Sequence, residues 1–391
     1  MEAIRKYQDQ LLAQAPFLKA DNDYHNAIKE AFLQTPRHHF IRKFKDPPNP
    51  EWQIVTPENE TSLLPSLYAN KALSLYDESA GEYASSISQP YLVLEMLELL
   101  ELKKGHTVFE IGASSGWNAA LMGALVGEEG HVYSAEIIPE MAAQARENIE
   151  RARLSNVSIL ETDAGYGHAA KAPFDRIIFT AATFDLPACF YHQLKDDGIL
   201  LLILKSTVGG DLLLQLKKVG DHFESVRSVE CSFVKMTGKY RSPEIEPILL
   251  EKLPEWEYLK DQEVSRTPLW WGGPKSIPLH FRTASFRSFL GIAEPGRRFI
   301  KEVHNAKSAG YFGMLDSNKS SLTIARDQLL ITYGNESSRL RLLELLHTWI
   351  DIGMPAPTNF RISIHRSGDE VELSKKSWVV TREDSKFIWT L

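Results

Sequence analysis

The chain has 391 residues, 43% of them hydrophobic, and a formal net charge of −7. This length favours two domains with ordinary cores, and the negative charge argues against a general nucleic-acid-binding protein, because phosphate binding needs surplus cations. Cys189 and Cys231 are the two cysteines, so neither a disulfide framework nor a thiolate zinc site is expected. The N-terminus lacks an apolar signal core and no apolar run is long enough to span a membrane, so we expect a cytoplasmic protein without membrane contact.

The N-terminal region has the apolar periodicity of α-helices. Helices are expected over residues 2–17 and from Asp23, a candidate N-cap, to Pro36. Another helix is expected to begin near Pro90, because proline is tolerated in the first turn, with Ser88 as its candidate N-cap.

Strand and helix patterns alternate from residue 107 onward. Strands are expected at 107–111, 131–136, 157–161, 176–180 and 199–204. Helices are expected between them at 117–126, 139–153 and 187–194. This alternation predicts an α/β fold with a Rossmann-like, doubly wound parallel sheet, within a first domain over residues 1–240.

The pattern changes after about Tyr240. Residues 241–276 are rich in proline, glutamate and tryptophan and are predicted to be a connector that ends near Trp270 and Trp271, an expected interdomain contact. Beyond it, strand-like runs occur at 279–282, 321–325, 329–333, 360–364, 378–380 and 387–389, and one amphipathic helix at 338–352. Residues 277–391 are therefore predicted to form a smaller α+β domain.

The stretch Gly112-Ala-Ser-Ser-Gly116 links the first strand of the alternation to the following helix. The two glycines allow a tight turn, and Ser114 or Ser115 is a candidate helix cap. Backbone N–H groups at a helix N-terminus attract anions, so the turn is a candidate site for a carboxylate or a phosphate.

Two interpretations of this turn are incomplete in the sequence. A dinucleotide-binding fingerprint needs a glycine where Ser114 stands. A nucleophile elbow of the pattern G-x-S-x-G would place a reactive serine at Ser114, with Asp175 or Asp185 and then His192 downstream, but no upstream sequence resembles an oxyanion loop.

A third interpretation is a site for S-adenosylmethionine. The turn would bind the methionine carboxylate, and Glu110 would lie near the methionine ammonium. Glu136 ends the next expected strand, where a carboxylate can accept both ribose hydroxyls, and Asp163 follows the third strand, within reach of the adenine amino group. Acidic residues at three successive strand ends favour this interpretation.

Several segments in the same order resemble the protein-L-isoaspartate O-methyltransferase family. They are A-F-L-Q-T-P-R-H-H-F at 31–40, S-I-S-Q-P-Y at 86–91, E-I-G at 110–112, E-I-I-P-E at 136–140, D-A-G-Y-G at 163–167 and A-P-F-D-R-I at 172–177. The resemblance covers roughly residues 20–238. Three positions depart from the family pattern: Ser114 and Ala164 replace glycines, and Tyr91 replaces a histidine.

The resemblance implies a methyltransferase domain with N-terminal helices and an extended form of the family, because the C-terminal 150 or so residues have no counterpart in the short repair enzymes. It implies S-adenosylmethionine as cofactor, and Ser88 as the residue beside the reacting carboxylate. Its implied cofactor residues are Glu110, Gly112, Ala113, Ser114, Gly116, Glu136, Ile137, Asp163 and Ala164. Its implied acceptor pocket is formed by Ile87, Gln89, Tyr91, Thr180 and Ala181.

The expected activity is carboxyl O-methylation of isoaspartyl or aspartyl residues in proteins or peptides. One alternative is tailoring of a ribosomally made peptide, in which an Asp methyl ester leads to aspartimide or isoaspartate and the C-terminal domain grips the peptide. A serine hydrolase built on Ser114 and a non-catalytic cofactor-binding module are alternatives from other classes. No metal is expected, since His38 and His39 lack neighbouring ligands at metal-site spacing.

Overall fold

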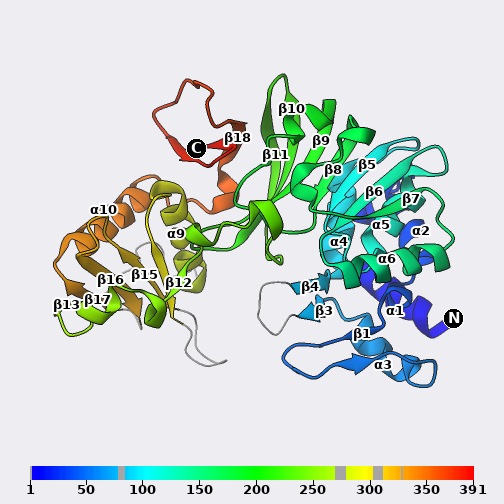
Figure 1. Cartoon of the computed structure of the whole chain (residues 1–391), viewed down its shortest axis with the longest axis horizontal. Helices are drawn as coiled ribbons and strands as arrows, with labels where there is room; N and C mark the ends of the chain where they lie inside the picture. The colour runs from blue at the N-terminus through cyan, green and yellow to red at the C-terminus, as the bar shows by residue number, and fades with distance from the viewer. Residues whose placement is uncertain (1, 78–83, 269–278, 303–310, 327–328) are drawn as a thin grey trace. The chain divides into compact units, whose positions relative to one another are not determined.

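The computed structural model describes residues 2–77, 84–268, 279–302, 311–326 and 329–391. The chain forms two compact units (Figure 1). The first comprises Met1–Ile203, Leu213–Arg227 and Phe233–Arg241, and the second comprises Leu204–Leu212, Ser228–Ser232 and Ser242–Leu391. In the part of the chain that is described, no helix has the length and apolar character needed to cross a bilayer.

Helices and two small hairpins form the N-terminal part of the first unit. The elements are α1 (Glu2–Ala13), α2 (Asp23–Gln34), β1 (Lys43–Phe44), β2 (Gln53–Ile54), α3 (Glu60–Leu67), β3 (Leu73–Asp77), β4 (Ala84–Ile87) and α4 (Pro90–Leu100). Two cap predictions are wrong. Asn22 caps α2 by accepting from the His25 N–H, and Gln89, not Ser88, is the N-cap position of α4, without a capping side-chain bond.

The central sheet confirms the predicted doubly wound α/β architecture. Its elements are β5 (Thr107–Ile111), α5 (Trp117–Val126), β6 (His131–Glu136), α6 (Pro139–Arg151), β7 (Val157–Glu161), β8 (Phe174–Phe179), α7 (Phe190–Gln193), β9 (Leu194–Leu204), β10 (Asp211–Val219) and β11 (His222–Cys231). The strands run in the order β11-β10-β9-β8-β5-β6-β7, and the pairs from β9 to β7 are parallel (Figure 1).

Helix α5 shows how the N-terminal helices complete this fold. Apart from Asn118 it is apolar on all sides, as expected of a helix that is covered by protein on both flanks. The indole of Trp117 is buried, donates from Nε1 to the Thr35 carbonyl at 3.0 Å, and contacts the Phe32 ring at a centroid distance of 6.0 Å. Helix α2 therefore packs directly on the helix that follows the glycine turn.

The second unit contains a six-stranded sheet in the order β12-β14-β15-β16-β17-β13. Its elements are β12 (Ile248–Leu249), α8 (Trp256–Leu259), β13 (Glu263–Pro268), α9 (Leu279–Ala293), β14 (Phe299–Glu302), β15 (Tyr311–Leu315), β16 (Ser321–Arg326), β17 (Leu329–Gly334) and α10 (Ser337–Asp351). Three antiparallel strands complete the unit: β18 (Arg361–Arg366), β19 (Ser377–Thr381) and β20 (Ser385–Thr390).

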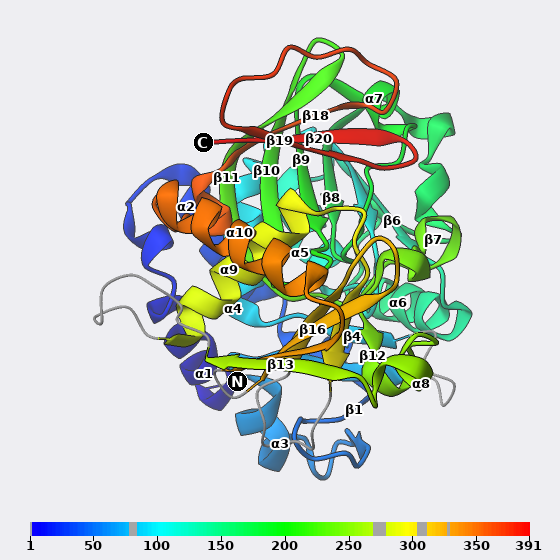
Figure 2. The same ribbon diagram turned by 90° about the vertical axis from the view of Figure 1, so that its left-hand side faces the viewer.

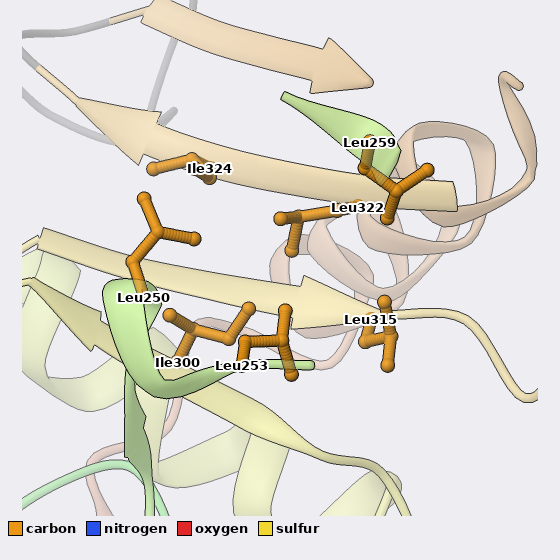
Figure 3. Close-up of a cluster of buried hydrophobic side chains, with 7 residues drawn as sticks. All are labelled: Leu250, Leu253, Leu259, Ile300, Leu315, Leu322 and Ile324. Carbon is orange, nitrogen blue, oxygen red and sulfur yellow. The ribbon is translucent and has the colours of Figure 1, made fainter. Parts of the chain in front are cut away.

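Much of the expected connector 241–276 belongs to this second fold. Strand β13 pairs antiparallel with β17. Leu250, Leu253 and Leu259 are buried against strand residues Ile300, Leu315, Leu322 and Ile324 (Figure 3). The composition of the stretch suggested a linker, but its leucines are needed to cover one face of the sheet. Trp270 and Trp271 lie outside the described residues.

The strand expected at 279–282 is also wrong, since this stretch begins α9. The residues that indicate a helix lie further along α9. Phe286, Phe289 and Leu290 are buried and have the spacing of one helical face. Helices α9 and α10 contact each other (Figure 2), with the Phe286 and Trp349 rings 5.5 Å apart. The four-residue alternation at 279–282 was too short to decide between strand and helix.

Candidate cofactor and acceptor site

A pocket in the first unit brings together most of the predicted site residues at the carboxyl ends of β5 and β6 and in the segments that follow β4, β7 and β8. The predicted residues that line it are Ile87, Ser88, Glu110, Gly112, Ala113, Ser114, Glu136, Ile137, Asp163, Ala164, Thr180 and Ala181. Gly116, Gln89 and Tyr91 are not part of the lining. Ligands of doubly wound sheets bind at this edge.

The turn after β5 is held in shape by Thr180. Gly112 and Gly116 have φ values of 103° and 83°, in the left-handed region that favours glycine. The Thr180 hydroxyl donates to the Gly112 carbonyl oxygen at 2.6 Å. A Cβ on Gly112 would lie only 2.7 Å from the oxygen of this hydroxyl. Gly116 occupies the N-cap position of α5, and Ser115 Oγ accepts from the Trp117 N–H at 3.4 Å. Ser114 is therefore not the helix cap.

Ser114 has a left-handed backbone conformation, and its hydroxyl both accepts and donates a hydrogen bond. Its φ of 48° is left-handed, which costs a non-glycine residue about 1–2 kcal/mol. Its hydroxyl accepts from Ser85 Oγ at 2.8 Å and donates to the Ser86 carbonyl at 3.0 Å. Within the described residues the hydroxyl has no histidine partner, and a nucleophile elbow requires one. The serine-hydrolase interpretation loses its geometric basis.

Glu110 and Asn118 are hydrogen-bonded neighbours that place two acceptor groups in the pocket lining. The Glu110 carboxyl accepts from Asn118 Nδ2 at 2.6 Å and from Ser134 Oγ at 2.5 Å. Burial raises the pKa of Glu110 to about 7. Asn118 Oδ1 is buried and has no hydrogen-bond partner among the described residues. Asn118 was not among the site residues predicted from the sequence, although a polar residue in an otherwise apolar helix is a visible signal.

The carboxylate of Glu136 supports the turn from the end of β6. Oε2 accepts from the Ser114 N–H at 2.7 Å, and Oε1 accepts from the Ile138 N–H at 3.0 Å. Burial raises the pKa of Glu136, and these backbone bonds oppose the shift. Each carboxylate oxygen has a second lone pair for a ligand hydroxyl.

Asp163 links two segments that border the pocket. Oδ1 accepts from the Gly165 N–H and Oδ2 from the Lys239 N–H, each at 2.8 Å. Residues 234–237, just before Lys239, also line the pocket. They are fixed to Ala182, whose N–H donates to the Val234 carbonyl and whose carbonyl accepts from the Met236 N–H, both at 2.8 Å. No role in the site was predicted for this segment, because its partner Ala182 is distant in the sequence.

The segment around Ser88 is anchored by Arg37, which was noted in the sequence only as part of a motif. Its buried guanidinium donates to the carbonyls of Ile87 at 3.3 Å and Ser88 at 3.0 Å. It also donates to the carbonyls of Leu67 and Lys71. Within the described residues no carboxylate pairs with it. A positive charge therefore lies directly behind Ser88.

Tyr91 lies outside the pocket lining. Its backbone N–H donates to Asn70 Oδ1 at 3.0 Å, and its ring makes an edge contact with Phe17 at 5.3 Å. Desolvation raises the pKa of its hydroxyl. The predicted role of Tyr91 in shaping the acceptor pocket is thus not reflected in the lining, nor is that of Gln89.

Comparisons with known proteins agree with this geometry. Residues 17–241 match the family model described as protein-L-isoaspartate(D-aspartate) O-methyltransferase. A protein-L-isoaspartate O-methyltransferase of Methanothrix thermoacetophila is 37% identical over 48% of this chain and 84% of its own length. One of Methanosarcina mazei is 33% identical over 54% of this chain and 77% of its own. A solved structure of a protein-L-isoaspartate O-methyltransferase, 22% identical, matches 92% of this chain and 95% of its own with a TM-score of 0.53, which shows a shared fold.

Proposed function

The chain belongs to the protein-L-isoaspartate(D-aspartate) O-methyltransferase family, and from this premise we propose which of its residues hold the cofactor and the acceptor. It is an S-adenosylmethionine-dependent carboxyl O-methyltransferase whose acceptors are isoaspartyl residues of proteins. S-adenosylmethionine supplies an electrophilic methyl group on a sulfonium. The protein's task is to bind this cofactor and to direct one carboxylate oxygen at that methyl.

The cofactor residues are those that line the pocket around the glycine turn. Backbone N–H groups at the start of α5 suit the methionine carboxylate. The ammonium suits Glu110 together with Asn118 Oδ1, and this buried acceptor without a partner is the observation that best supports the fit. Glu136 suits the ribose hydroxyls, and Asp163 with Ala164 suits the adenine. The acidic residues Glu110, Glu136 and Asp163 in the lining also suit the positive charge of the cofactor.

Ser88 is the residue we assign to the acceptor carboxylate. A carboxylate is already ionised near neutral pH, so the reaction needs no strong base. Catalysis then consists mainly of alignment, in which oxygen, methyl and sulfur lie on one line. The Ser88 hydroxyl can donate to the oxygen that does not react, and the charge of Arg37 behind it favours an anionic acceptor.

The test is methyl transfer from labelled cofactor to two peptides that differ only in an isoAsp or an Asp residue. We expect base-labile label on the isoAsp peptide and a loss of at least tenfold in kcat/KM for Ser88→Ala, with cofactor affinity retained. Calorimetry with S-adenosylhomocysteine is the binding control. Cofactor binding without label on either peptide contradicts the proposed acceptor, and wild-type kcat/KM in Ser88→Ala contradicts the role of Ser88.

Peptide tailoring is a second candidate function. Tailoring would use the second unit, which continues beyond the family match at residue 241 with a sheet and core of its own. We propose that this unit recognises the substrate and that the enzyme acts in the cytoplasm. In tailoring, a backbone nitrogen would attack the ester carbonyl of the Asp methyl ester and expel methanol. The aspartimide that forms is lighter than the starting peptide by one water. Mass spectrometry of the Asp peptide after reaction separates tailoring from repair.

A further inference from the structure

We propose that Ser114 is a positioning residue, whose hydroxyl ties the cofactor turn to strand β4 and thereby sets where Ser88 meets the acceptor. The inference rests on the proposed function and concerns the same pocket. Glycine stands at this position in the family pattern that the sequence resembles, so the tie uses a side chain that this pattern lacks.

The tie consists of two consecutive hydrogen bonds, in which each hydroxyl donates to the next oxygen. Ser85 Oγ donates to Ser114 Oγ at 2.8 Å, and Ser114 Oγ donates to the Ser86 carbonyl at 3.0 Å. Ser85 is 5% exposed, so water competes weakly for these bonds. Ser85 and Ser86 belong to β4, whose last residue is followed by Ser88. A shift of the turn therefore moves the strand that leads into the acceptor residue.

The backbone of Ser114 is joined to the cofactor side of the same pocket. Its N–H donates to Glu136 Oε2 at 2.7 Å, and its φ is 48°. A glycine would make the same N–H bond and adopt this φ without strain. The serine therefore adds only one thing that glycine lacks, and this is the hydroxyl that reaches β4.

Strand β4 is thus held from two sides. Ser114 holds Ser85 and Ser86 from the turn, and Arg37 holds the carbonyls of Ile87 and Ser88. Alignment in a transfer reaction is sensitive to displacements of about 1 Å, which can cost on the order of a hundredfold in rate. Loss of one anchor should therefore reduce transfer to the acceptor more than it reduces cofactor binding.

The test compares Ser114→Gly, Ser114→Ala and Ser85→Ala with the exposed control Ser62→Ala. For Ser114→Gly we expect kcat/KM for the isoAsp peptide to fall about tenfold, while the Kd for S-adenosylhomocysteine stays within about threefold and Tm does not fall. Ser114→Ala should show the same loss with a lower Tm than Ser114→Gly, because it keeps the strained backbone. Ser85→Ala retains the hydrogen bond from Ser114 Oγ to the Ser86 carbonyl. In this variant we expect kcat/KM for the isoAsp peptide to fall about threefold.

Hydrogen exchange of amides 84–88 gives a readout independent of turnover. With S-adenosylhomocysteine bound, these amides should be more protected in the wild type than in Ser114→Gly. Wild-type kcat/KM in Ser114→Gly, or a loss of activity matched by an equal loss of cofactor affinity, overturns the proposal. If the wild type labels no peptide, the proposed function fails, and equal protection in the two proteins would then overturn the tie as well.

Discussion

The Nδ2 group of Asn118 lies 2.6 Å from Oε1 of Glu110 in the lining of the pocket. The bond orients the amide so that Asn118 Oδ1 remains available to a donor. It also leaves Glu110 with neutral partners, Asn118 and Ser134, so its charge is balanced only when a cation binds. This balance leads to two predictions about pH.

Cofactor affinity should depend on the ionisation of Glu110. The pKa of Glu110 is about 7, so the carboxyl becomes neutral as the pH falls below that value and loses its attraction for an ammonium. We expect the Kd for S-adenosylhomocysteine to rise by up to about tenfold per pH unit between pH 7 and 5. Glu110→Gln should bind weakly, with little of this pH dependence. The same slope in the variant would assign the effect to another group, such as Glu136.

The stability of the ligand-free protein should change with pH in the opposite sense. The pKa of Glu110 rises from 4.5 in the unfolded chain to about 7 in the folded protein, so the folded state binds the proton more tightly. The contribution is fully present below about pH 4.5 and is lost as the pH rises through 7. In urea titrations at pH 8, Glu110→Gln should be more stable than the wild type by up to about 3 kcal/mol. A less stable variant at pH 8 would contradict this.

Arg37→Lys should destabilise the protein despite keeping the charge. A lysine ammonium is a point donor and cannot reach the carbonyls of both Leu67 and Ser88, which the planar guanidinium bridges. Bonds to charged groups contribute about 1.5–3 kcal/mol each, so we expect a loss of about 3 kcal/mol in chemical denaturation. The control Arg42→Lys alters an exposed ion pair with Glu147 and should change stability by less than about 1 kcal/mol. Equal losses in the two variants would contradict a special role for Arg37.

Gly238→Ala should weaken cofactor binding, whereas Gly220→Ala should not. Both glycines have positive φ, 75° and 63°, so both substitutions carry a similar backbone cost. A Cβ on Gly238 would lie 2.3 Å from Asp163 Oδ2, while one on Gly220 meets nothing within 4 Å. We expect the Kd for S-adenosylhomocysteine to rise at least tenfold for Gly238→Ala alone. Equal affinities would show that Asp163 and its neighbours do not contribute to the site.

Leu322→Ala should destabilise the second unit. Leu322 is fully buried in the leucine and isoleucine cluster, and such truncations cost about 2–5 kcal/mol. The matched control is Leu340→Ala, since Leu340 is 57% exposed and should cost less than about 0.5 kcal/mol. Hydrogen exchange should report the loss in β15, β16 and β17. If exchange stays unchanged there, the cluster is not the core of this unit.

Regular local patterns were predictable from the sequence. Strand β5 and helix α5 have the bounds that periodicity and the glycine turn predicted, because a buried parallel strand and an apolar helix each carry a pattern within a few residues. Glu110, Glu136 and Asp163 were recognised for a similar reason, since the ends of parallel strands lie at one edge of the sheet. The fold class and the family thus followed from short-range signals and their order.

Contacts between residues distant in the sequence became visible only in the folded protein. Arg37 anchors residues 50 and 51 positions away, and Ser114 meets Ser85 across 29 positions. The leucines of 241–276 pack against strands that come later in the chain. Local sequence patterns were enough to predict the α/β core, the glycine turn after β5 and the acidic residues around it. The hydrogen bonds from Ser114 to β4 depend on chain segments that only folding brings together, and no local sequence pattern predicts such contacts.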